Sequence, residues 1–398
     1  MPPPLRILHV VPYYEQAWAY GGIPRLATAM TRGLARRGHA VTVCTTDVCD
    51  ATSRASGSNP GLTPAVHVFP NVSNRLAYHW QLFTPIGLAA YLRAHARQFD
   101  VAHLHACRNL PVVIAARALR RAGVPYVLSP NGTAPAIERR IAIKHLFDAT
   151  IGRDSVRRAA RLVAATRAER DQLQRLGVPS ARVAVVPNPF DESEFESAPD
   201  GMRFRRTHGL EQARIVLFLG KLTPRKGVDV LLRAFRHLAH RGDRLVIAGN
   251  DMGSGATIAA LVTALGLERC VHRVGLLRGR DRLDALAAAD VVVYPSRDEI
   301  FGLVAVEALL CGTPVVVCDD SGCGEIVREL GGGRLVPYGS DTALAAAIAS
   351  ILDERPAWDE RVRDAAVQAR ARFRSDAIAQ RLEDLYREVL HERHARAA

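Results

Sequence analysis

The sequence lacks the patterns that define several common classes of protein. No run approaches 18 uninterrupted apolar residues, so no transmembrane helix is expected. The first residues, MPPPLRILHVVPYY, contain no charged segment followed by a long apolar one, so no secretory signal is expected. Seven cysteines are scattered without a Cys-x-x-Cys pair, which predicts reduced thiols instead of disulfides or a zinc site. We therefore expect a cytoplasmic protein whose contact with a membrane, if any, is peripheral.

Lysine is also scarce, and the positive charge is unevenly placed. Of 53 basic residues only Lys144, Lys221 and Lys226 are lysines. Residues 1–192 contain 24 basic and 11 acidic residues, whereas the remainder contains 29 of each, so the net charge of +13 lies in the first half. An anionic membrane or a phosphorylated acceptor molecule fits this field. Nucleic acid is not expected, because no nucleic-acid motif or aromatic interleaving accompanies the charge. A solvated arginine-rich surface is the alternative.

The 398 residues exceed what one hydrophobic core usually supports, which predicts more than one domain. Short apolar runs alternate with helical patterns, and this order is typical of parallel sheets covered by helices. We expect one domain over residues 1–192 and a second over 193–375. A final helix over 376–398 could pack on either domain, including back on the first. The predicted strands are 6–12, 40–45, 66–70, 101–105, 126–129, 161–165 and 183–186, then 215–219, 244–248, 271–274, 291–295 and 315–318.

Two loops that follow predicted strands have residues suited to anions, and ligands of open α/β sheets bind at the carboxyl ends of strands. The pair Gly21 and Gly22 precedes a helix, where free N–H groups can face an anion, although such a pair is often only a turn. The loop Gly220–Gly227, GKLTPRKG, holds two of the three lysines of the chain together with Arg225. A compact ammonium group binds phosphate as a point charge, so this loop predicts a diphosphate site. A solvated basic turn is the alternative.

A third motif, Ser296–Glu307, follows the strand predicted over 291–295. Its Phe301-Gly302-Leu303 should open a helix and offer backbone amides to a second anionic centre. Glu299 lies in the loop before that helix, and Glu307 follows about two turns along it. Carboxylates accept hydrogen bonds from the vicinal hydroxyls of a ribose or a sugar. The motif therefore predicts two hydroxyl-binding carboxylates.

These motifs together resemble glycosyltransferase family four, the retaining "group 1" enzymes. The segment Cys311–Val316, CGTPVV, extends the likeness in the second half, and Leu34–Val41 and Asp100–His105 extend it in the first. The resemblance implies an α/β fold of the GT-B type, with two facing Rossmann-like, doubly wound parallel-sheet domains and a cleft between them. It also implies transfer of a hexosyl group from a nucleotide diphosphate sugar, UDP-sugar first and GDP-sugar next. The acceptor would be a hydroxyl of a glycan, a glycolipid or a lipid-linked molecule.

The resemblance assigns a role to each motif residue. It implies that Lys221, Lys226 and Arg225 bind the donor diphosphate, with Gly21 and Gly22 touching it from the other domain. It further implies that Glu307 binds the ribose, that Glu299 holds sugar hydroxyls near the anomeric carbon, and that His105 reaches the sugar's 6-hydroxyl region. The backbone amides of Phe301, Gly302 and Leu303 would support the phosphate and the sugar. The residues expected to act in catalysis are His105, Glu299 and Lys226.

The sequence departs from the family pattern at two places and lacks one motif, and two rival functions remain. Lys221 stands where the family has Arg, and Asn188–Asp191 reads NPFD in place of N-G-V-D. No Asp-x-Asp occurs, the motif through which GT-A enzymes hold their metal. We therefore expect no metal and no cofactor, with lysines and helix amides neutralising the leaving diphosphate. The alternatives are a nucleotide-sugar epimerase and a catalytically inactive subunit that retains nucleotide affinity.

A basic, helix-compatible stretch in the first half predicts a second kind of partner. Together with nearby aromatic residues it could rest on an anionic membrane and collect a lipid-linked acceptor. A solvated helix face is the alternative. The residues concerned are Arg139, Arg140, Lys144, Arg153, Arg157, Arg158 and Arg161, with Trp80, Phe83 and Tyr91.

Overall fold

The computed structural model describes residues 3–135, 141–239 and 242–397, and the chain forms two compact units. Unit 1 comprises Met1–Asp191 together with Phe373–Ala398, and unit 2 comprises Glu192–Arg372. The end of the chain thus returns to the unit in which it began. No helix described in either unit has both the length and the apolarity of a membrane span.

Unit 1 is built on a sheet of seven parallel strands in the order β3-β2-β1-β4-β5-β6-β7. All seven strands expected in the first half are present, with ends that differ by at most two residues. They are β1 (Arg6–Val10), β2 (Ala40–Thr46), β3 (Ala65–Phe69), β4 (Val101–His105), β5 (Tyr126–Ser129), β6 (Arg161–Ala164) and β7 (Val183–Val185).

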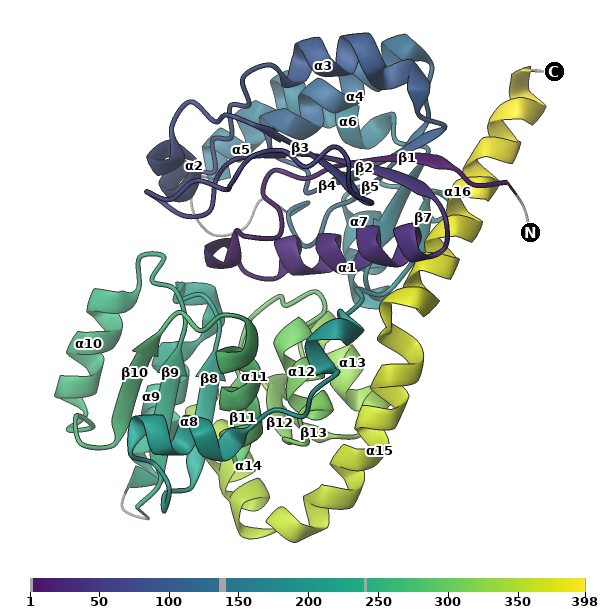
Figure 1. Ribbon diagram of the computed structural model, residues 1–398. Coiled ribbons are helices and arrows are strands. Elements are labelled where there is room, and N and C mark those ends of the chain that lie inside the picture. The colour runs from purple at the N-terminus through teal and green to yellow at the C-terminus, as the bar shows by residue number, and fades with distance from the viewer. Residues whose placement is uncertain (1–2, 136–140, 240–241, 398) are drawn as a thin grey trace. The chain divides into compact units, whose positions relative to one another are not determined.

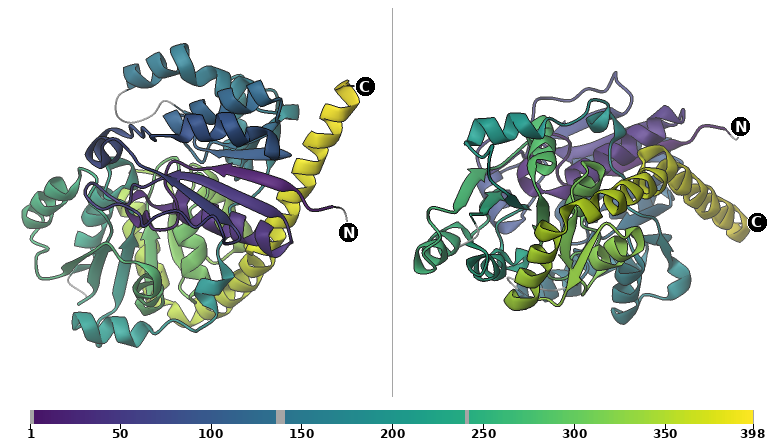
Figure 2. Two further views of the ribbon diagram at one scale, coloured as in Figure 1. Left: turned by 45° about the horizontal axis from the view of Figure 1, so that its top comes forward. Right: turned by 90° about the horizontal axis from the view of Figure 1, so that it is seen from below.

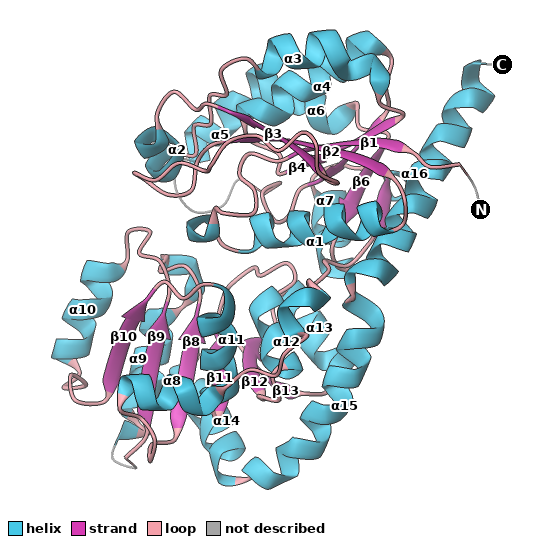
Figure 3. Ribbon diagram, in the orientation of Figure 1, coloured by secondary structure: helices cyan, strands magenta, loops and turns pink. Residues whose placement is uncertain are grey.

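Helices cover both faces of this sheet because successive side chains of each strand point to opposite sides. Leu8 and Leu104 face a core shared with α3 and α4, whereas Ile7 and Val101 face α1 and α16. Figures 1 and 3 show these helices around the strands. The helices of unit 1 are α1 (Gly22–Arg36), α2 (Asn74–Trp80), α3 (Leu88–His95), α4 (Leu110–Ala122), α5 (Ile141–Phe147), α6 (Arg153–Arg157), α7 (Arg167–Arg175) and α16 (Ser375–Ala397).

The C-terminal helix α16 packs against α1, and its yellow ribbon passes beside the purple one of α1 in Figures 1 and 2. Its apolar side is fully buried at Leu382 and Tyr386. Gly33 of α1 permits the close approach, because a Cβ atom there would lie 2.8 Å from the carbonyl oxygen of Ser375. The Glu383 carboxylate accepts hydrogen bonds from the guanidinium of Arg37 at 2.8 and 2.9 Å. This helix is therefore an integral layer of unit 1.

Unit 2 repeats the architecture with six parallel strands in the order β10-β9-β8-β11-β12-β13. Five of these strands match the expected ones; the edge strand β13 was not expected, because its Gly-Arg start reads as a loop. The strands are β8 (Ile215–Leu219), β9 (Arg244–Ala248), β10 (Val271–Gly275), β11 (Val291–Tyr294), β12 (Val315–Cys318) and β13 (Gly333–Val336). The helices are α8 (Gly201–His208), α9 (Val228–Arg236), α10 (Gly255–Ala264), α11 (Gly279–Ala288), α12 (Leu303–Leu310), α13 (Gly322–Leu330), α14 (Asp341–Asp353) and α15 (Arg355–Phe373).

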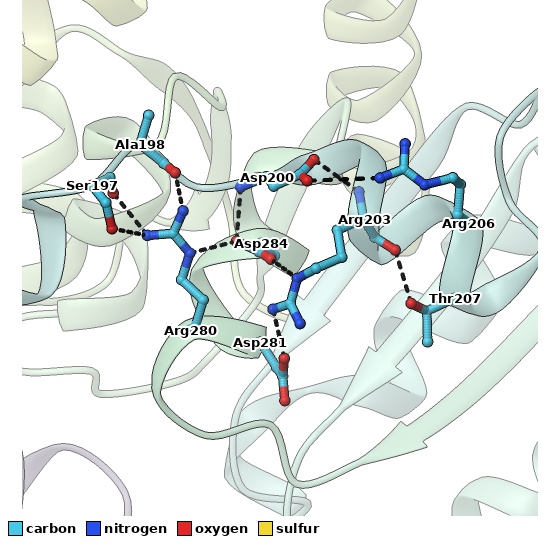
Figure 4. A network of polar contacts seen from close by, with 9 residues as sticks. All are labelled: Ser197, Ala198, Asp200, Arg203, Arg206, Thr207, Arg280, Asp281 and Asp284. Carbon is cyan, nitrogen blue, oxygen red and sulfur yellow. Dashed lines mark hydrogen bonds and ion pairs between the residues drawn. The ribbon is translucent and has the colours of Figure 1, made fainter.

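A network of ionic contacts fastens the first residues of unit 2 to α11 (Figure 4). The buried carboxylate of Asp284 accepts hydrogen bonds from the Asp200 amide at 2.8 Å and from Arg203 Nε at 2.6 Å. Arg280 lies 3.1 Å from the same carboxylate and donates to the carbonyl and hydroxyl oxygens of Ser197. Because Asp284 has almost no exposed surface, these partners compensate a charge that burial would otherwise penalise.

Candidate active site

Both sheets have a point at which the strand order reverses, and the predicted site residues flank these two points. In unit 1 the reversal lies between β1 and β4, whose carboxyl ends lead to Gly21 and to His105. In unit 2 it lies between β8 and β11, whose carboxyl ends lead to Lys226 and to Glu299. Open α/β sheets bind ligands at such reversal points. The topology therefore places each predicted group where a ligand is expected.

In unit 2 the side chains of Lys226, which is buried, and Glu299, which is partly exposed, form an ion pair across the reversal point. Lys226 Nζ also contacts the hydroxyl of Tyr294 at the end of β11. Tyr294 and Ser296 donate hydroxyl hydrogen bonds to Glu299 Oε2 at 3.2 and 3.1 Å. Within the described residues every contact of the Glu299 side chain is to Oε2, and 19% of that side chain is exposed. Oε1 is thus available to accept a hydrogen bond from a ligand.

The charges of this cluster determine its protonation. Burial alone would raise the pKa of Glu299, but Lys226 and Arg225 and the hydrogen bonds from Lys226 and Ser296 lower that pKa to about 2. Burial lowers the pKa of Lys226, and Glu299 opposes that change. Because an ionised carboxylate lies beside it, we assign Lys226 as an ammonium group. Tyr294, whose pKa is raised by burial and by Glu299, stays a neutral hydrogen-bond donor.

The backbone on either side of Glu299 is held in place. Ser321 Oγ and the Cys323 amide donate to the carbonyl oxygen of Glu299 at 3.0 and 2.8 Å. The preceding residue, Asp298, has a φ of 52°, a left-handed conformation that costs a non-glycine residue energy. Backbone strain of this kind persists where the surroundings enforce it and clusters at functional sites. The fixed backbone therefore holds the Glu299 carboxylate in a defined position.

The glycine loop places its cations around the end of β8. Lys221 and Arg225 are half-buried, and Arg225 Nη1 donates to the carbonyl oxygen of Asp298 at 3.4 Å. Gly227 ends the loop with a φ of 67°, and a Cβ atom there would lie 2.3 Å from the carbonyl oxygen of Pro295. The loop after β8 is therefore pressed against the loop after β11, which brings Lys226 to Glu299.

The start of α12 lies where the motif predicts it. The helix begins at Leu303, with Gly302 at its N-cap in a left-handed conformation, φ 72°. A Cβ atom at Gly302 would lie 2.2 Å from Cys323 Sγ, so only glycine fits. Phe301 is buried and Leu303 is half-buried. The first turn of α12 thus lies directly after Glu299, as anion binding by its amides requires.

Glu307, which is predicted to bind the ribose, is buried and paired in unit 2. The side chain has no exposed surface and forms an ion pair with Arg282 of α11. Arg282, itself 2% exposed, also binds Glu194 at 2.7 Å. A ribose can therefore reach Glu307 only after a local displacement of the groups around it. Sequence reasoning missed Arg282, because its neighbourhood, RGRDRLD, reads as a solvated helix face.

In unit 1 the two glycines after β1 differ in their constraints. Gly21 has φ 89° and ψ −135°, a conformation that only glycine adopts readily, and it is the N-cap of α1. At Gly22 a Cβ atom would have nothing within 4 Å. The backbone requirement thus falls on Gly21, while the space beside Gly22 is open to a ligand.

His105 belongs to a cluster of three buried imidazoles on the face of the sheet covered by α16. His105 Nε2 lies 3.0 Å from His9 Nδ1, and the rings of His103 and His105 are stacked with centroids 4.4 Å apart. His103 uses both ring nitrogens, toward the Tyr386 hydroxyl and Ser129 Oγ, each at 2.7 Å. Ala106, directly after His105, has a φ of 65°, so strained backbone also accompanies this predicted catalytic residue.

The histidine cluster is neutral. Burial lowers the pKa of His105 to about 3 and, together with the neighbouring His105, lowers the pKa of His9 well below its ordinary value. The three side chains offer nitrogens within 4.8 Å of one another, as metal ligands would. However, both nitrogens of His103 have other partners and its ring lies flat on His105, which favours a hydrogen-bonded cluster over a set of metal ligands.

The structure corrects the predicted basic and aromatic surface in unit 1. Phe83 is buried against Tyr13 and Tyr20, with ring centroids 5.3 and 5.8 Å away, so it is not available to a membrane. Arg161 is largely buried and pairs with Glu388 and Glu392 of α16. Tyr91 is half-buried, stacked on His95 at 4.4 Å. Trp80 is exposed, and Arg139 and Arg140 lie outside the described residues.

Solved structures define the class. The chain superposes on HepE of Anabaena in complex with UDP and glucose with a TM-score of 0.76 and 23% identity, covering 96% of this chain and all of that one. It superposes on sucrose-phosphate synthase of Thermosynechococcus elongatus with a TM-score of 0.77 and 21% identity, covering 97% and 99%. The two parallel-sheet units and these structural neighbours together show that the chain has the GT-B fold.

Sequence relatives define the family. Residues 20–194 match the model described as Glycosyltransferase Family 4, and residues 202–372 match Glycosyl transferases group 1. The D-inositol 3-phosphate glycosyltransferase of Kineococcus radiotolerans is 34% identical, covering 79% of this chain and 77% of that protein. That of Acidothermus cellulolyticus is 33% identical, covering 95% and 88%. The chain belongs to the group 1 glycosyltransferases of family 4 and is a glycosyltransferase.

Proposed function

We propose that this enzyme transfers a hexosyl group from a UDP-sugar to an acceptor hydroxyl, with retention of anomeric configuration and without a metal. The observation that carries the proposal is the Lys226–Glu299 pair at the strand-order reversal of unit 2, with Glu299 Oε1 left to accept a sugar hydroxyl. Lys221 and Arg225 lie in the same loop and would share the diphosphate charge with Lys226. The choice of donor is supported by HepE of Anabaena, a protein of similar fold that was solved in complex with UDP and glucose.

In the proposed reaction the bond between the anomeric carbon and the diphosphate breaks, and a bond to the acceptor oxygen forms on the same face. The acceptor's proton passes to an oxygen of the leaving diphosphate, so no protein base is needed. Retaining hydrolases use a carboxylate nucleophile, but here three groups bind Glu299 Oε2 and hold that carboxylate in place. We assign Glu299 to hold sugar hydroxyls, and His105 to contact the 6-hydroxyl region of the sugar.

For the acceptor we propose a hydroxyl of a phosphorylated molecule. Curated relatives are named for D-inositol 3-phosphate, and the whole net positive charge lies in residues 1–192. An anionic acceptor would be attracted by such a field. A glycan, glycolipid or lipid-linked acceptor, as the sequence predicts, would also fit where it carries a phosphate.

The test is a transfer assay with UDP-, GDP- and ADP-sugars and inositol phosphate, with and without EDTA. We expect transfer from a UDP-sugar that EDTA does not change, and NMR of the product should show the donor's anomeric configuration. Glu299→Gln should lose at least tenfold in kcat, because the carboxylate partner of both Lys226 and the sugar is lost. Loss of activity in EDTA or an inverted product would contradict the proposal, and UDP binding without transfer would indicate the inactive-subunit alternative.

We further propose that unit 1 associates peripherally with anionic membranes through α5. Its Ile141, Ile143 and Leu146 are 46%, 54% and 64% exposed, with Lys144 among them. Apolar side chains flanked by a cation are typical of interfacial helices. Sedimentation with phosphatidylglycerol vesicles at low salt should recover the wild type but not Ile143→Ser/Leu146→Ser. Leu176→Ser changes an exposed leucine directly after α7. It is the matched control and should leave binding intact. Equal recovery of all variants, or of none, would refute this association.

A further inference from the structure

His9 of β1 makes a contact that the proposed function does not yet use. Its Cα pairs in register with His103, yet its side chain reaches His105, two residues further along β4, where Nδ1 of His9 and Nε2 of His105 are 3.0 Å apart. Neither imidazole has any exposed surface. The two rings therefore form a short chain of nitrogen atoms that ends at the strand-order reversal of unit 1.

The two ends of this chain lack partners. Among the described residues, His9 Nε2 and His105 Nδ1 make no hydrogen bond, whereas both nitrogens of the neighbouring His103 are satisfied. Buried polar atoms are nearly always hydrogen-bonded, so an exception calls for an explanation. At His105 the explanation at hand is a ligand, because this residue closes a strand at the ligand-binding edge of the sheet. Since its side chain has no exposed surface, a ligand reaches Nδ1 only after a local displacement of the groups around it.

We infer that His9 is a positioning residue that fixes the tautomer of His105, so that His105 Nδ1 carries a proton and donates it in a hydrogen bond to the transferred sugar. This inference rests on the proposed function, which brings the sugar's 6-hydroxyl region to His105. In this proposal His9 contacts neither the donor nor the acceptor. It acts only through its hydrogen bond to the imidazole of His105.

The direction of the bond follows from His9 Nε2, the end of the chain to which the proposed function assigns no ligand. If His9 Nδ1–H donates to His105 Nε2, then His9 Nε2 keeps only a lone pair, and the His105 proton sits on Nδ1. The opposite direction would leave a buried N–H at His9 Nε2 without an acceptor. Orphaned buried donors are rarer than under-satisfied acceptors, which favours the first arrangement. Both rings are neutral at physiological pH, so each carries one proton and the two tautomers are coupled.

The test compares two variants in the full-length enzyme. His9→Leu removes the hydrogen bond to His105, and Tyr386→Phe removes a hydrogen bond to His103 in the same buried cluster without touching that contact. We expect nitrogen-15 NMR of His105 to show a protonated Nδ1 in wild type and Tyr386→Phe, and a mixture of tautomers in His9→Leu. His9→Asn keeps an amide near the position of Nδ1 and should restore the wild-type tautomer in part.

Transfer rates provide the second measurement. His9→Leu should lose about tenfold in kcat/KM with UDP-glucose, the value of one hydrogen bond, and almost nothing with a UDP-6-deoxyglucose donor. UDP affinity should not change. An unaltered His105 tautomer in His9→Leu, or equal losses with both donors, would overturn the inference. A full rate in His105→Ala would instead refute the proposed role of His105, which separates the two failures.

Discussion

A buried ammonium group needs compensation where it lies, and Lys226 has it from Glu299 and the Tyr294 hydroxyl. Removing one partner of a buried pair leaves the other charge unpaired. Lys226→Met should therefore lower the free energy of unfolding in urea by about 3 kcal/mol and weaken UDP binding. Lys221→Met is the control, because Lys221 is only half-buried and outside the pair; it should weaken UDP binding with little loss of stability. Equal stability losses in the two variants would contradict this assignment.

The pair also predicts a pH dependence of stability. The pKa of Glu299, about 2 in the folded protein, lies below its unfolded value of about 4.5. A carboxyl whose pKa is lowered on folding stabilises the protein above the unfolded pKa, and this stabilisation disappears as the pH falls toward the folded one. Wild type should thus lose more stability than Glu299→Gln between pH 4.5 and 2, as measured by urea unfolding. Parallel curves would show that Glu299 has an ordinary pKa.

At the scale of elements, Arg282 connects three pieces of unit 2. It lies on α11, pairs with Glu307 on α12, and binds Glu194 in the turn that precedes α8. Arg282→Gln should lower the free energy of unfolding by about 3–5 kcal/mol, because two buried or half-buried carboxylates lose their shared cation. Arg297→Gln, an exposed cation of the same unit, should cost at most about 1 kcal/mol. A small effect at both positions would mean that the contacts of Arg282 with Glu194 and Glu307 do not hold these elements together.

Helix α16 supports a second prediction at this scale. Leu382 is fully buried between the helix and the sheet of unit 1. Leu382→Ala should destabilise the protein by about 2–5 kcal/mol through lost burial and the cavity left behind. Val367→Ala in α15, where the side chain is 69% exposed, is the matched control and should be nearly neutral in thermal unfolding. If both variants melt alike, the packing of α16 contributes little to unit 1.

At the scale of the whole molecule, the donor contacts predicted from the sequence fall on residues of both units. Lys221, Lys226 and Glu307 belong to unit 2, whereas Gly22 and His105 belong to unit 1. In hydrogen–deuterium exchange, UDP alone should protect segments 220–227 and 299–307, and a non-transferable UDP-sugar should be needed to protect 101–110. Protection of segment 101–110 by UDP alone would reassign His105 from the sugar to the nucleotide.

Local patterns predicted much of this fold and less of its site. Apolar runs located twelve strands, and loops after them located Lys226 and Glu299, because these features are local in sequence. The edge strand β13 escaped because Gly333 and Arg334 give no apolar run. The partners of the site residues also escaped: His9 and His105 are 96 positions apart and meet only through strand register. The burial of Phe83 and Glu307 likewise depends on tertiary packing, which composition and spacing do not predict.

The return of the chain to unit 1 has a consequence for how the protein is made on the ribosome. Domains generally fold as units, the N-terminal one first, while the rest of the chain is still being synthesised. Here the sheet of unit 1 is complete at β7, yet α16, which together with α1 covers Ile7, Val101 and the histidine cluster, is translated only after unit 2. Unit 2 emerges entirely in between. Unit 1 therefore begins before unit 2 and is completed after it, and a nascent chain stalled before residue 375 should expose to chaperones the part of the apolar sheet face that α16 covers.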